Sequence, residues 1–272
     1  MSAQTDSRPA SDVPVRSGLP EMPRATVLGT ELALTDYDGA MDWMDEVVRR
    51  RERACVTAAA VHLVMVARED DATRAAVDRS LAVPDGVPLV WALRALGHRQ
   101  ATRVYGPDLM AAYCARSAHT GTTMYLYGGR SAEALDELTR ALLERYPGLR
   151  IVGGWSPPFR PLTDAERDEV AARINATGAD VVWVGTGQPK QEKWMAEMRD
   201  RLDAPILGGV GAAFDFHAGL VPQAPSWMQR RGLEWTYRLA REPRRLWRRY
   251  ARYNPRFVAA FARQYAAHRA GR

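Results

Sequence analysis

The most informative stretch of this 272-residue chain is Val181-Val182-Trp183-Val184-Gly185-Thr186-Gly187-Gln188-Pro189-Lys190-Gln191-Glu192. Its apolar run is typical of a buried strand, its glycines of a turn, and its polar end of the first turn of a helix. Backbone N–H groups at such a helix start, together with Lys190, favour the binding of a phosphate or diphosphate. The side-chain amide of Gln191 is suited to sugar hydroxyls. An ordinary strand-to-helix connection with solvated charges is the alternative interpretation.

The same unit of strand, glycine turn and helix recurs along the chain. Strand-like runs are Ala54–Thr57, Leu81–Pro84, Thr123–Tyr127, Leu149–Val152, Val181–Gly185 and Ile206–Val210. Helical patterns lie between them, for example at Ser131–Tyr146 and Asp164–Thr177. This alternation predicts an α/β fold, with a Rossmann-like parallel sheet and helices on both faces. Because ligands bind beyond the carboxyl ends of such strands, the turns are expected to line the site. Glycines of these turns are Gly185, Gly187, Gly209 and Gly211.

Composition excludes several classes of protein. The hydrophobic share of 46% and the charged share of 26% are ordinary for a globular chain. No apolar run reaches the ~18 residues that a membrane-spanning helix needs. Two cysteines are too few for a disulfide framework or a four-ligand zinc site. Residues 1–25 show neither periodicity nor an apolar secretory segment, which predicts a disordered leader on a cytoplasmic protein.

The charge is distributed unevenly between a core at 26–227 and a tail at 228–272. From Arg230 to the end of the chain, 13 Arg stand against 2 Glu, although the net charge of the whole chain is only +6. Interleaved aromatic residues predict an appendage of amphipathic helices with breaks near Pro243 and Pro255. Such a tail indicates a polyanionic partner: an anionic membrane, a diphosphate or nucleic acid. A merely solvated helix face is the alternative, and self-repulsion makes it costly.

Two acidic motifs have competing interpretations. Pro84-Asp85-Gly86 places a carboxylate at the end of a predicted strand, where it is suited to act as a general base, although turn-forming Asp-Gly pairs are common. Asp36-Tyr37-Asp38 has the spacing of a divalent metal site, but Thr35 and Asp38 fit a helix capping box better. No metal site is therefore predicted.

Six motifs come in the order found in the WecG/TagA/CpsF glycosyltransferase family, which the chain resembles over about residues 28–253. They are Pro84-Asp85-Gly86, Arg103-Val104-x-Gly106-x-Asp108-Leu109, Gly185-x-Gly187-x-Pro189-Lys190-Gln191-Glu192, Gly209-x-Gly211-x-x-Phe214-Asp215-Phe216-x-x-Gly219, Ala224-Pro225-x-Trp227-Met228 and Gly232-Leu233-Glu234-Trp235-x-Tyr237-Arg238-Leu239. The resemblance implies an inverting transferase that moves a sugar from a UDP donor to a polyprenyl-diphosphate-linked sugar. N-acetylmannosamine or its uronic acid is the typical sugar, and the products are bacterial surface polysaccharides such as teichoic acid or exopolysaccharide. It further implies a peripheral position on the inner face of the cell membrane, and it makes a homo-oligomer plausible.

The resemblance also assigns roles to individual residues. Asp85 matches the catalytic base, Thr57 a polar residue at the mouth of the cleft, and Arg103 and Gln191 residues of binding or catalysis. The expected substrate-binding residues are Gly185, Gly187, Lys190, Gly209, Gly211, Asp215, Arg238, Arg245 and Arg248. No cofactor is implied, so arginines and helix N-termini are expected to neutralise the leaving diphosphate. The chain departs from the family where Ala59 and Val61 replace an Asn and an acidic residue.

Two other functions stay open at this point. One is a nucleotide-binding oxidoreductase with a basic tail, although Gly208–Phe216 lacks the complete Gly-x-Gly-x-x-Gly spacing. The other is a nucleic-acid-binding module that uses the Arg and aromatic residues of the tail, which leaves the glycine turns unexplained. The resemblance favours a transferase at an anionic membrane surface, with no nucleic-acid partner.

Overall fold

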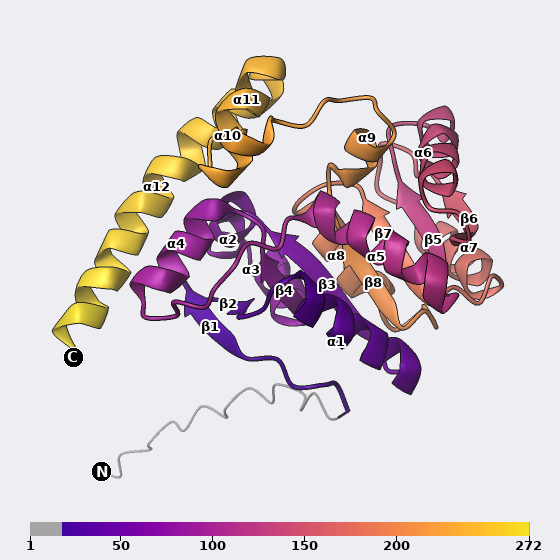
Figure 1. The fold of residues 1–272 in the computed structure, drawn as a ribbon, viewed down its shortest axis with the longest axis horizontal. Coiled ribbons are helices and arrows are strands. Elements are labelled where there is room, and N and C mark those ends of the chain that lie inside the picture. Colours follow the sequence, from indigo (N-terminus) through magenta and orange to yellow (C-terminus); the bar gives the residue numbers. More distant parts are fainter. Residues whose placement is uncertain (1–17, 272) are drawn as a thin grey trace, which may run out of the picture.

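Six parallel strands form the centre of the structure, a computed structural model that describes residues 18–271 apart from the side chain of Arg245 (Figure 1). The strands are β3 (Ala54–Ala59), β4 (Ser80–Pro84), β5 (Thr123–Gly128), β6 (Arg150–Trp155), β7 (Val181–Gly185) and β8 (Ile206–Gly209). Their order across the sheet is β4-β3-β8-β7-β5-β6. All six strands predicted from the sequence are confirmed, with ends that differ by a few residues.

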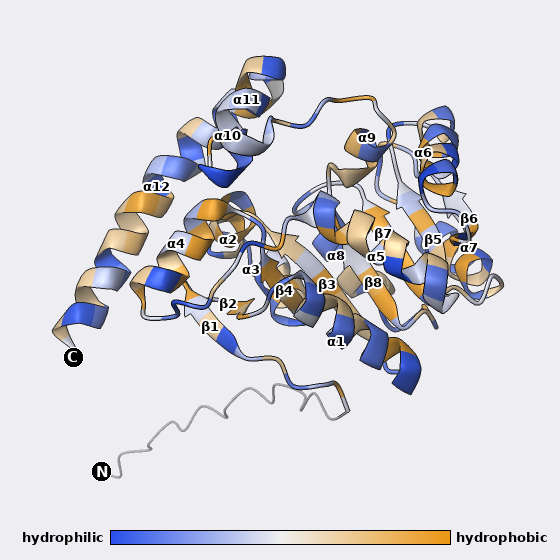
Figure 2. Ribbon diagram, viewed as in Figure 1, coloured by the Kyte–Doolittle hydropathy of each residue, from blue (hydrophilic) through white to orange (hydrophobic). Residues whose placement is uncertain are grey.

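Helices cover both faces of this sheet. They are α1 (Tyr37–Arg50), α2 (Val61–Ala67), α3 (Asp71–Asp78), α4 (Val87–Ala95), α5 (Gly106–Thr120), α6 (Ala132–Arg145), α7 (Asp164–Asn175), α8 (Lys190–Met198) and α9 (Ala213–His217). Side chains along β7 alternate between two cores: Val181 and Trp183 pack with α1, α5 and α6, whereas Val182 and Val184 pack with α7 and α8. Burial on both sides explains why central strands such as β7 and β8 are mostly apolar, as Figure 2 shows, whereas the edge strand β6 is only partly buried. The predicted Rossmann-like architecture is confirmed.

A short antiparallel hairpin, which the sequence did not predict, extends the fold beside the sheet. It consists of β1 (Arg24–Val27) and β2 (Thr30–Ala33). The turn between the strands holds Leu28 and Gly29 at positive φ. The first strand overlaps the end of the predicted leader, and the indole N–H of Trp43 donates to the carbonyl of Pro20 at 2.7 Å. Residues 18–25 are therefore packed against the core, and the rest of the predicted leader (1–17) lies outside the described residues.

The tail forms three helices that dock on the core. They are α10 (Ser226–Arg230), α11 (Glu234–Arg241) and α12 (Pro243–Ala270). The long helix α12 runs along one side of the molecule (Figure 1), where Tyr253 meets the ring of His62 edge-on at 5.0 Å and Phe257 is buried. Gln264 bonds the hairpin twice, because its amide accepts from Leu28 N–H at 2.9 Å and donates to Thr26 O at 3.0 Å. The appendage is thus part of the folded unit.

The break predicted near Pro243 is confirmed and the one near Pro255 is wrong. Pro243 begins α12, where its missing N–H costs nothing, but α12 continues through Pro255. A proline inside a helix costs about 3 kcal/mol or more. Packing of Tyr253, Phe257 and Phe261 against the core cluster on both sides of Pro255 offsets that cost.

The predicted capping box at the start of α1 is also corrected. Asp36, and not Thr35, caps this helix, because its carboxylate accepts from Gly39 N–H at 2.9 Å. Aspartate is as good an N-cap as threonine, so the helix can begin after Asp36 as favourably as after Thr35. In Asp36-Tyr37-Asp38, the first aspartate therefore serves to cap α1.

Candidate active site

The carboxyl ends of β3, β4, β5, β7 and β8 open into one cavity of about 1370 Å³. This is the place where open α/β sheets bind ligands. The glycine turns lie on the sheet side of the cavity, and α11 and α12 form the opposite wall. Five aromatic side chains of α12 line this wall: Tyr250, Tyr253, Phe257, Phe261 and Tyr265. The cavity therefore has a polar part at the sheet and an apolar part along α12.

Asp85 sits at the polar part, directly after β4, with 19% of its side chain exposed. The Nε of Arg103 donates to the backbone carbonyl of Asp85, and its Nη2 lies 3.3 Å from the Asp85 Oδ1. The arginine is held there because the N–H of Val104 donates to the carbonyl of Pro84 at 3.0 Å. The same Nη2 lies 2.7 Å from Oε2 of Glu234, the first residue of α11. Asp85, Arg103 and Glu234 form a row of carboxylate, guanidinium and carboxylate.

The environment of Asp85 suits a general base. Burial raises the pKa of its carboxyl to about 7; the charge of Arg103 opposes this rise and the charge of Glu234 adds to it. A carboxyl with a pKa near the working pH is available as the anion and is basic enough to accept a proton from a hydroxyl. The predicted role of Asp85 is therefore chemically reasonable at this position.

The glycine turns bring the backbone close to the cavity. Gly185, Gly187 and Gly211 line it, whereas Gly209 is buried and does not line it. A Cβ on Gly185 would lie 2.5 Å from the ring of Phe214, and Gly211 has a φ of +57° that side chains rarely adopt. Side chains at these two positions would push the turns out of place.

The lining of the cavity near the start of α8 contains both polar and apolar residues. Lys190, its first residue, lines the cavity as predicted. Thr186 also lines it, and its hydroxyl is buried without a hydrogen-bond partner in the described part of the chain, which marks it as a group for a ligand to satisfy. Ala60 and Val61 add an apolar part to the lining, and Ala59, one of the two expected departures from the family pattern, is fully buried.

Arg130 and Asp215 form the second charged cluster of the cavity. The guanidinium binds the carboxylate through two contacts of 2.9 Å, and it lies 3.9 Å from Glu242 at the end of α11. Asp215 lines the cavity, as predicted, but in this structure its carboxylate is paired with Arg130. A phosphate that enters this part of the cavity would meet Arg130 beside Asp215.

Thr57 and Gln191 lie beneath the cavity and do not line it, so the expectation that Thr57 stands at the mouth of the cleft is wrong. Both are fully buried and both bond Glu192: the threonine hydroxyl donates to Oε1 at 2.7 Å and the Gln191 amide at 2.9 Å. Burial raises the pKa of Glu192. The Gln191 carbonyl also accepts from Gly211 N–H at 3.0 Å, so this network supports the Gly209–Gly211 turn from below.

The three arginines predicted to hold a diphosphate do not lie together. Arg238 lines the cavity, with its guanidinium 5.7 Å from the ring centre of Phe216. Arg248 is exposed on α12, packs on Trp247 and does not reach the cavity. Arg245 lies in α12, but its side chain is outside the described residues. The structure therefore places one of the three at the site.

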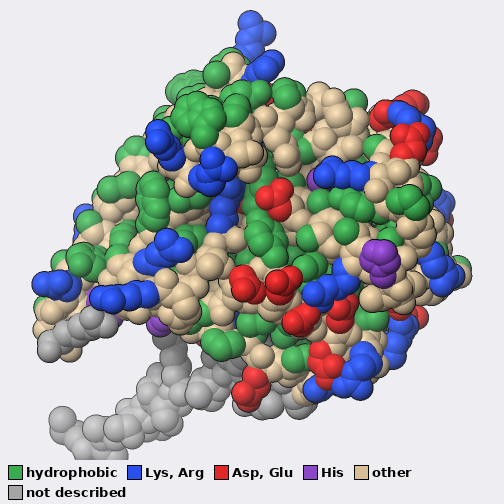
Figure 3. Space-filling model, viewed as in Figure 1, with side chains coloured by type: hydrophobic (Ala, Val, Ile, Leu, Met, Phe, Trp, Pro, Cys, Tyr) green, Lys and Arg blue, Asp and Glu red, His purple; other side chains and the backbone are tan. Residues whose placement is uncertain are grey.

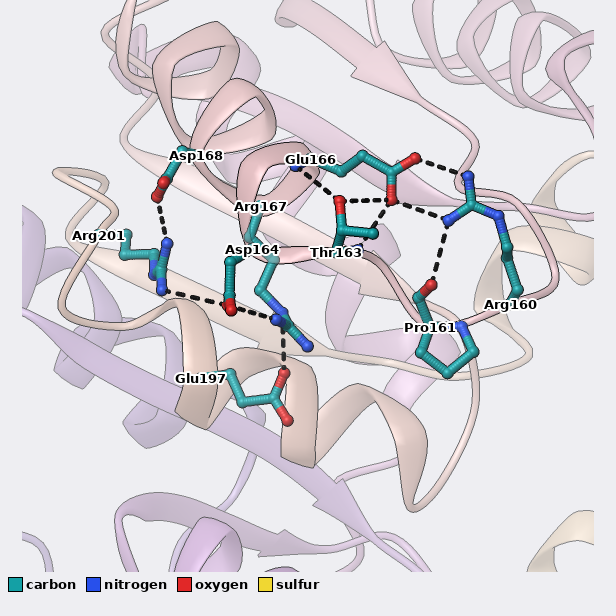
Figure 4. A network of polar contacts seen from close by, with 9 residues as sticks. All are labelled: Arg160, Pro161, Thr163, Asp164, Glu166, Arg167, Asp168, Glu197 and Arg201. Atoms are coloured by element: carbon teal, nitrogen blue, oxygen red, sulfur yellow. Dashed lines mark hydrogen bonds and ion pairs between the residues drawn. The ribbon is translucent and has the colours of Figure 1, made fainter.

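A proline-rich segment forms the rim on the far side of the cavity. Arg160 of this segment binds Glu166 of α7 at 2.6 Å and donates to the carbonyl of Pro161 at 3.2 Å (Figure 4). Glu166 and Thr163 cap α7 reciprocally, so the rim is tied to a stable helix start. Pro157, Pro158 and Phe159 of the same segment line the cavity.

The outer surface of the appendage is basic and aromatic. In the view of Figure 3, Arg side chains alternate with hydrophobic ones over α10–α12, whereas acidic side chains lie mainly over the core. Large exposed apolar side chains of the appendage are Trp227, Leu233, Trp235, Trp247 and Val258, and Trp91 of α4 in the core is exposed as well. Within residues 18–271, no helix is long and apolar enough to cross a membrane. Nor do the described side chains bring three or more His, Cys, Asp or Glu together as a metal site.

Sequence reasoning missed Arg130, Tyr105 and Glu234 as site residues. The hydroxyl of Tyr105 donates to Oε1 of Glu234 at 2.9 Å, and the Arg103 guanidinium stacks on its ring at 4.1 Å. One signal pointed to Glu234: the basic tail contains only two glutamates, Glu234 and Glu242, and both meet arginines of the core at the cavity.

A comparison with known protein families bears on this choice of functions. The sequence model of the glycosyl transferase WecG/TagA/CpsF family matches residues 25–271, nearly the whole chain, including both the core and the appendage. This match favours a transferase over the oxidoreductase and the nucleic-acid-binding module. The chain belongs to the WecG/TagA/CpsF family of glycosyltransferases.

Proposed function

We propose that the chain is an inverting transferase that moves a sugar from a UDP donor to the hydroxyl of a polyprenyl-diphosphate-linked sugar. The sugar is of the N-acetylmannosamine type or its uronic acid, and the product belongs to a bacterial surface polysaccharide. The observation that carries this proposal is Asp85, a carboxylate with a raised pKa in a large cavity, fixed by Arg103 at the end of a strand.

In the proposed mechanism Asp85 accepts the proton of the acceptor hydroxyl. The oxygen attacks the anomeric carbon of the donor, the bond from this carbon to the diphosphate breaks, and UDP leaves. A single displacement inverts the anomeric configuration. One carboxylate is sufficient for this step, because the leaving diphosphate needs no proton at neutral pH.

The departing diphosphate requires positive charge in the cavity. We assign this role to Lys190 at the start of α8, Arg238 and Arg130, which line the cavity, together with the positive end of the α8 helix dipole. We propose that these groups take the place of a metal ion. The apolar wall of Ala60 and Val61 would then face a part of the substrates that needs no hydrogen bond.

The basic, aromatic surface of the appendage supports a peripheral position on the inner face of the cell membrane. Each Arg near an anionic leaflet contributes about 1 kcal/mol, and interfacial Trp side chains add to this attraction. The acceptor lipid would reach the cavity from that surface, because α11 and α12 border both.

A panel of UDP-sugars, combined with a synthetic polyprenyl-diphosphate-linked acceptor in anionic vesicles, tests the proposal. UDP release that depends on both substrates, with an inverted anomeric centre in the product by NMR, is the expected result. Release of UDP without an acceptor would indicate simple hydrolysis. A product with retained configuration would refute the single displacement.

A further inference from the structure

Glu234 occupies an unusual position for an acidic residue in a basic tail. Its side chain is only 13% exposed, and it enters the cavity from the first turn of α11. The turn before it approaches the core closely, because a Cβ on Gly232 would lie 3.1 Å from Val87 at the start of α4. The appendage thus delivers one carboxylate beside Asp85.

Glu234 and Asp85 share one guanidinium nitrogen, which donates to both carboxylates. Arg103 Nη2 is 2.7 Å from Glu234 Oε2 and 3.3 Å from Asp85 Oδ1, so the closer partner is the carboxylate of the appendage. Tyr105 fixes that carboxylate through its hydroxyl. Arg103 still holds Asp85 in place through the bond from Nε to the backbone carbonyl, which does not involve the reacting carboxylate.

We propose that Glu234 is a positioning residue, through which the docked appendage draws the Arg103 guanidinium toward itself, keeps its contact with the carboxylate of Asp85 long, and so preserves the strength of the base. This inference rests on the proposed function of Asp85. If Glu234 were absent, the guanidinium would close on Asp85, and a fully paired carboxylate is a weak base. The core would then reach full activity only with its appendage in place, and the coupling would act through one side chain.

The charges around Asp85 agree with this inference. The titratable and charged groups that face it are Arg103, Glu234, Arg238, Tyr105 and Tyr37. Among the charged ones, Glu234 raises the pKa of Asp85, whereas Arg103 and Arg238 lower it. Burial raises the pKa of Tyr37 to about 12 and that of Tyr105 still further, so both hydroxyls stay neutral at physiological pH.

The test compares Glu234→Gln with the parent in two measurements: the pH profile of kcat/KM, and the pH titration of the Asp85 carboxyl by ¹³C NMR. Both midpoints should move to lower pH by roughly one unit, because an unopposed guanidinium stabilises the carboxylate. The plateau of kcat should fall several-fold, because a weaker base removes the proton more slowly. Glu234→Asp, which keeps the charge, should recover part of the shift.

Glu69→Gln is the matched control. Glu69 also ties the appendage to the core, through Arg252 at 2.6 Å and Arg256 at 2.9 Å, but it pairs with no group of the active site. Its loss should leave both midpoints unchanged. If Glu234→Gln does not fold, Tyr105→Phe provides the same test, because it releases the Glu234 carboxylate and should give a smaller shift in the same direction.

Each outcome decides the question. Midpoints in Glu234→Gln equal to those of the parent, with turnover lowered at every pH, would mean that Glu234 only fastens the appendage, and the inference would be wrong. The same holds if Tyr105→Phe, used in its place, leaves both midpoints unmoved. If no UDP-sugar supports turnover but the NMR midpoint still moves, the proposed function fails and the coupling of Glu234 to Asp85 stands.

Discussion

Asp85→Asn tests two properties of this carboxylate separately: its role in turnover and its effect on the stability of the folded protein. The substitution keeps the shape of the side chain, and its amide oxygen can still accept from Arg103, but it removes the base. If Asp85 takes the acceptor proton, turnover should fall by about 10²–10⁴-fold, the usual contribution of general-base catalysis. UDP release at saturating substrate and pH 8 measures this loss. A turnover within about threefold of the parent would exclude Asp85 as the base.

The same substitution should stabilise the protein, by an amount that depends on pH. Burial raises the pKa of Asp85 from 3.8 to about 7. Between these values the folded protein keeps a proton that the unfolded chain has lost, so the parent loses stability as pH rises from 4 to 7. A difference of about three units corresponds to about 4 kcal/mol at pH 8. Asn has no such dependence, so the advantage of the variant should grow over this range, by about 2–4 °C in Tm per kcal/mol.

Tm values of the parent and the variant at pH 4 and pH 8 test this reasoning. Asp136→Asn is the control, because Asp136 is an exposed carboxylate on α6 and its replacement should give the same small change at both pH values. If the Tm difference for Asp85→Asn is likewise independent of pH, the carboxyl does not hold its proton up to neutral pH. The argument for a strong buried base would then fail, even if turnover were lost.

Three further outcomes are expected. Thr57→Val should lower the free energy of unfolding by about 1–3 kcal/mol, because it leaves the buried Glu192 with one fewer hydrogen bond. Urea denaturation measures this loss, and an unchanged midpoint would contradict the supporting role of the network. EDTA should leave turnover intact, and loss of activity that Mg²⁺ or Mn²⁺ restores would show that a metal ion assists the leaving group. Arg238→Gln should reduce UDP release without changing sedimentation with anionic vesicles, whereas Arg248→Gln should weaken only the vesicle binding. Equal effects of the two substitutions in both assays would mean that the two arginines share one role.

Most of the sheet was predictable because all of its strands except β6 are buried almost throughout. Such strands are short, apolar and bounded by glycine turns, which a sequence displays directly, as at Val181–Gly185. The same burial hides which way a side chain points. Thr57 lies in a strand that is buried throughout, so no alternation of polar and apolar residues indicated that its hydroxyl faces Glu192 and not the cavity.

The hairpin and the continuous helix at Pro255 depend on contacts between distant parts of the chain. Each strand of the hairpin has four residues, too few for a periodic pattern, and Gln264 from the other end of the sequence bonds it. A proline inside a helix is locally unfavourable, which is why a break was predicted near Pro255, but the burial of Phe257 that offsets this cost is a tertiary effect. Local sequence patterns therefore predict neither the hairpin nor the continuity of α12 at Pro255.

The tail shows most clearly how composition and position differ in what they reveal. An excess of arginine predicts an anionic partner, whatever the arrangement of the side chains. The partner that an arginine meets depends on the helix face from which its side chain projects. Arg238 of α11 lines the cavity, whereas Arg248 of α12 is exposed at the surface. The two glutamates, which a charge count treats as a small correction, are the residues that meet Arg103 and Arg130. In a tail dominated by one charge sign, the few residues of the opposite sign are therefore the better guide to where it meets the active site.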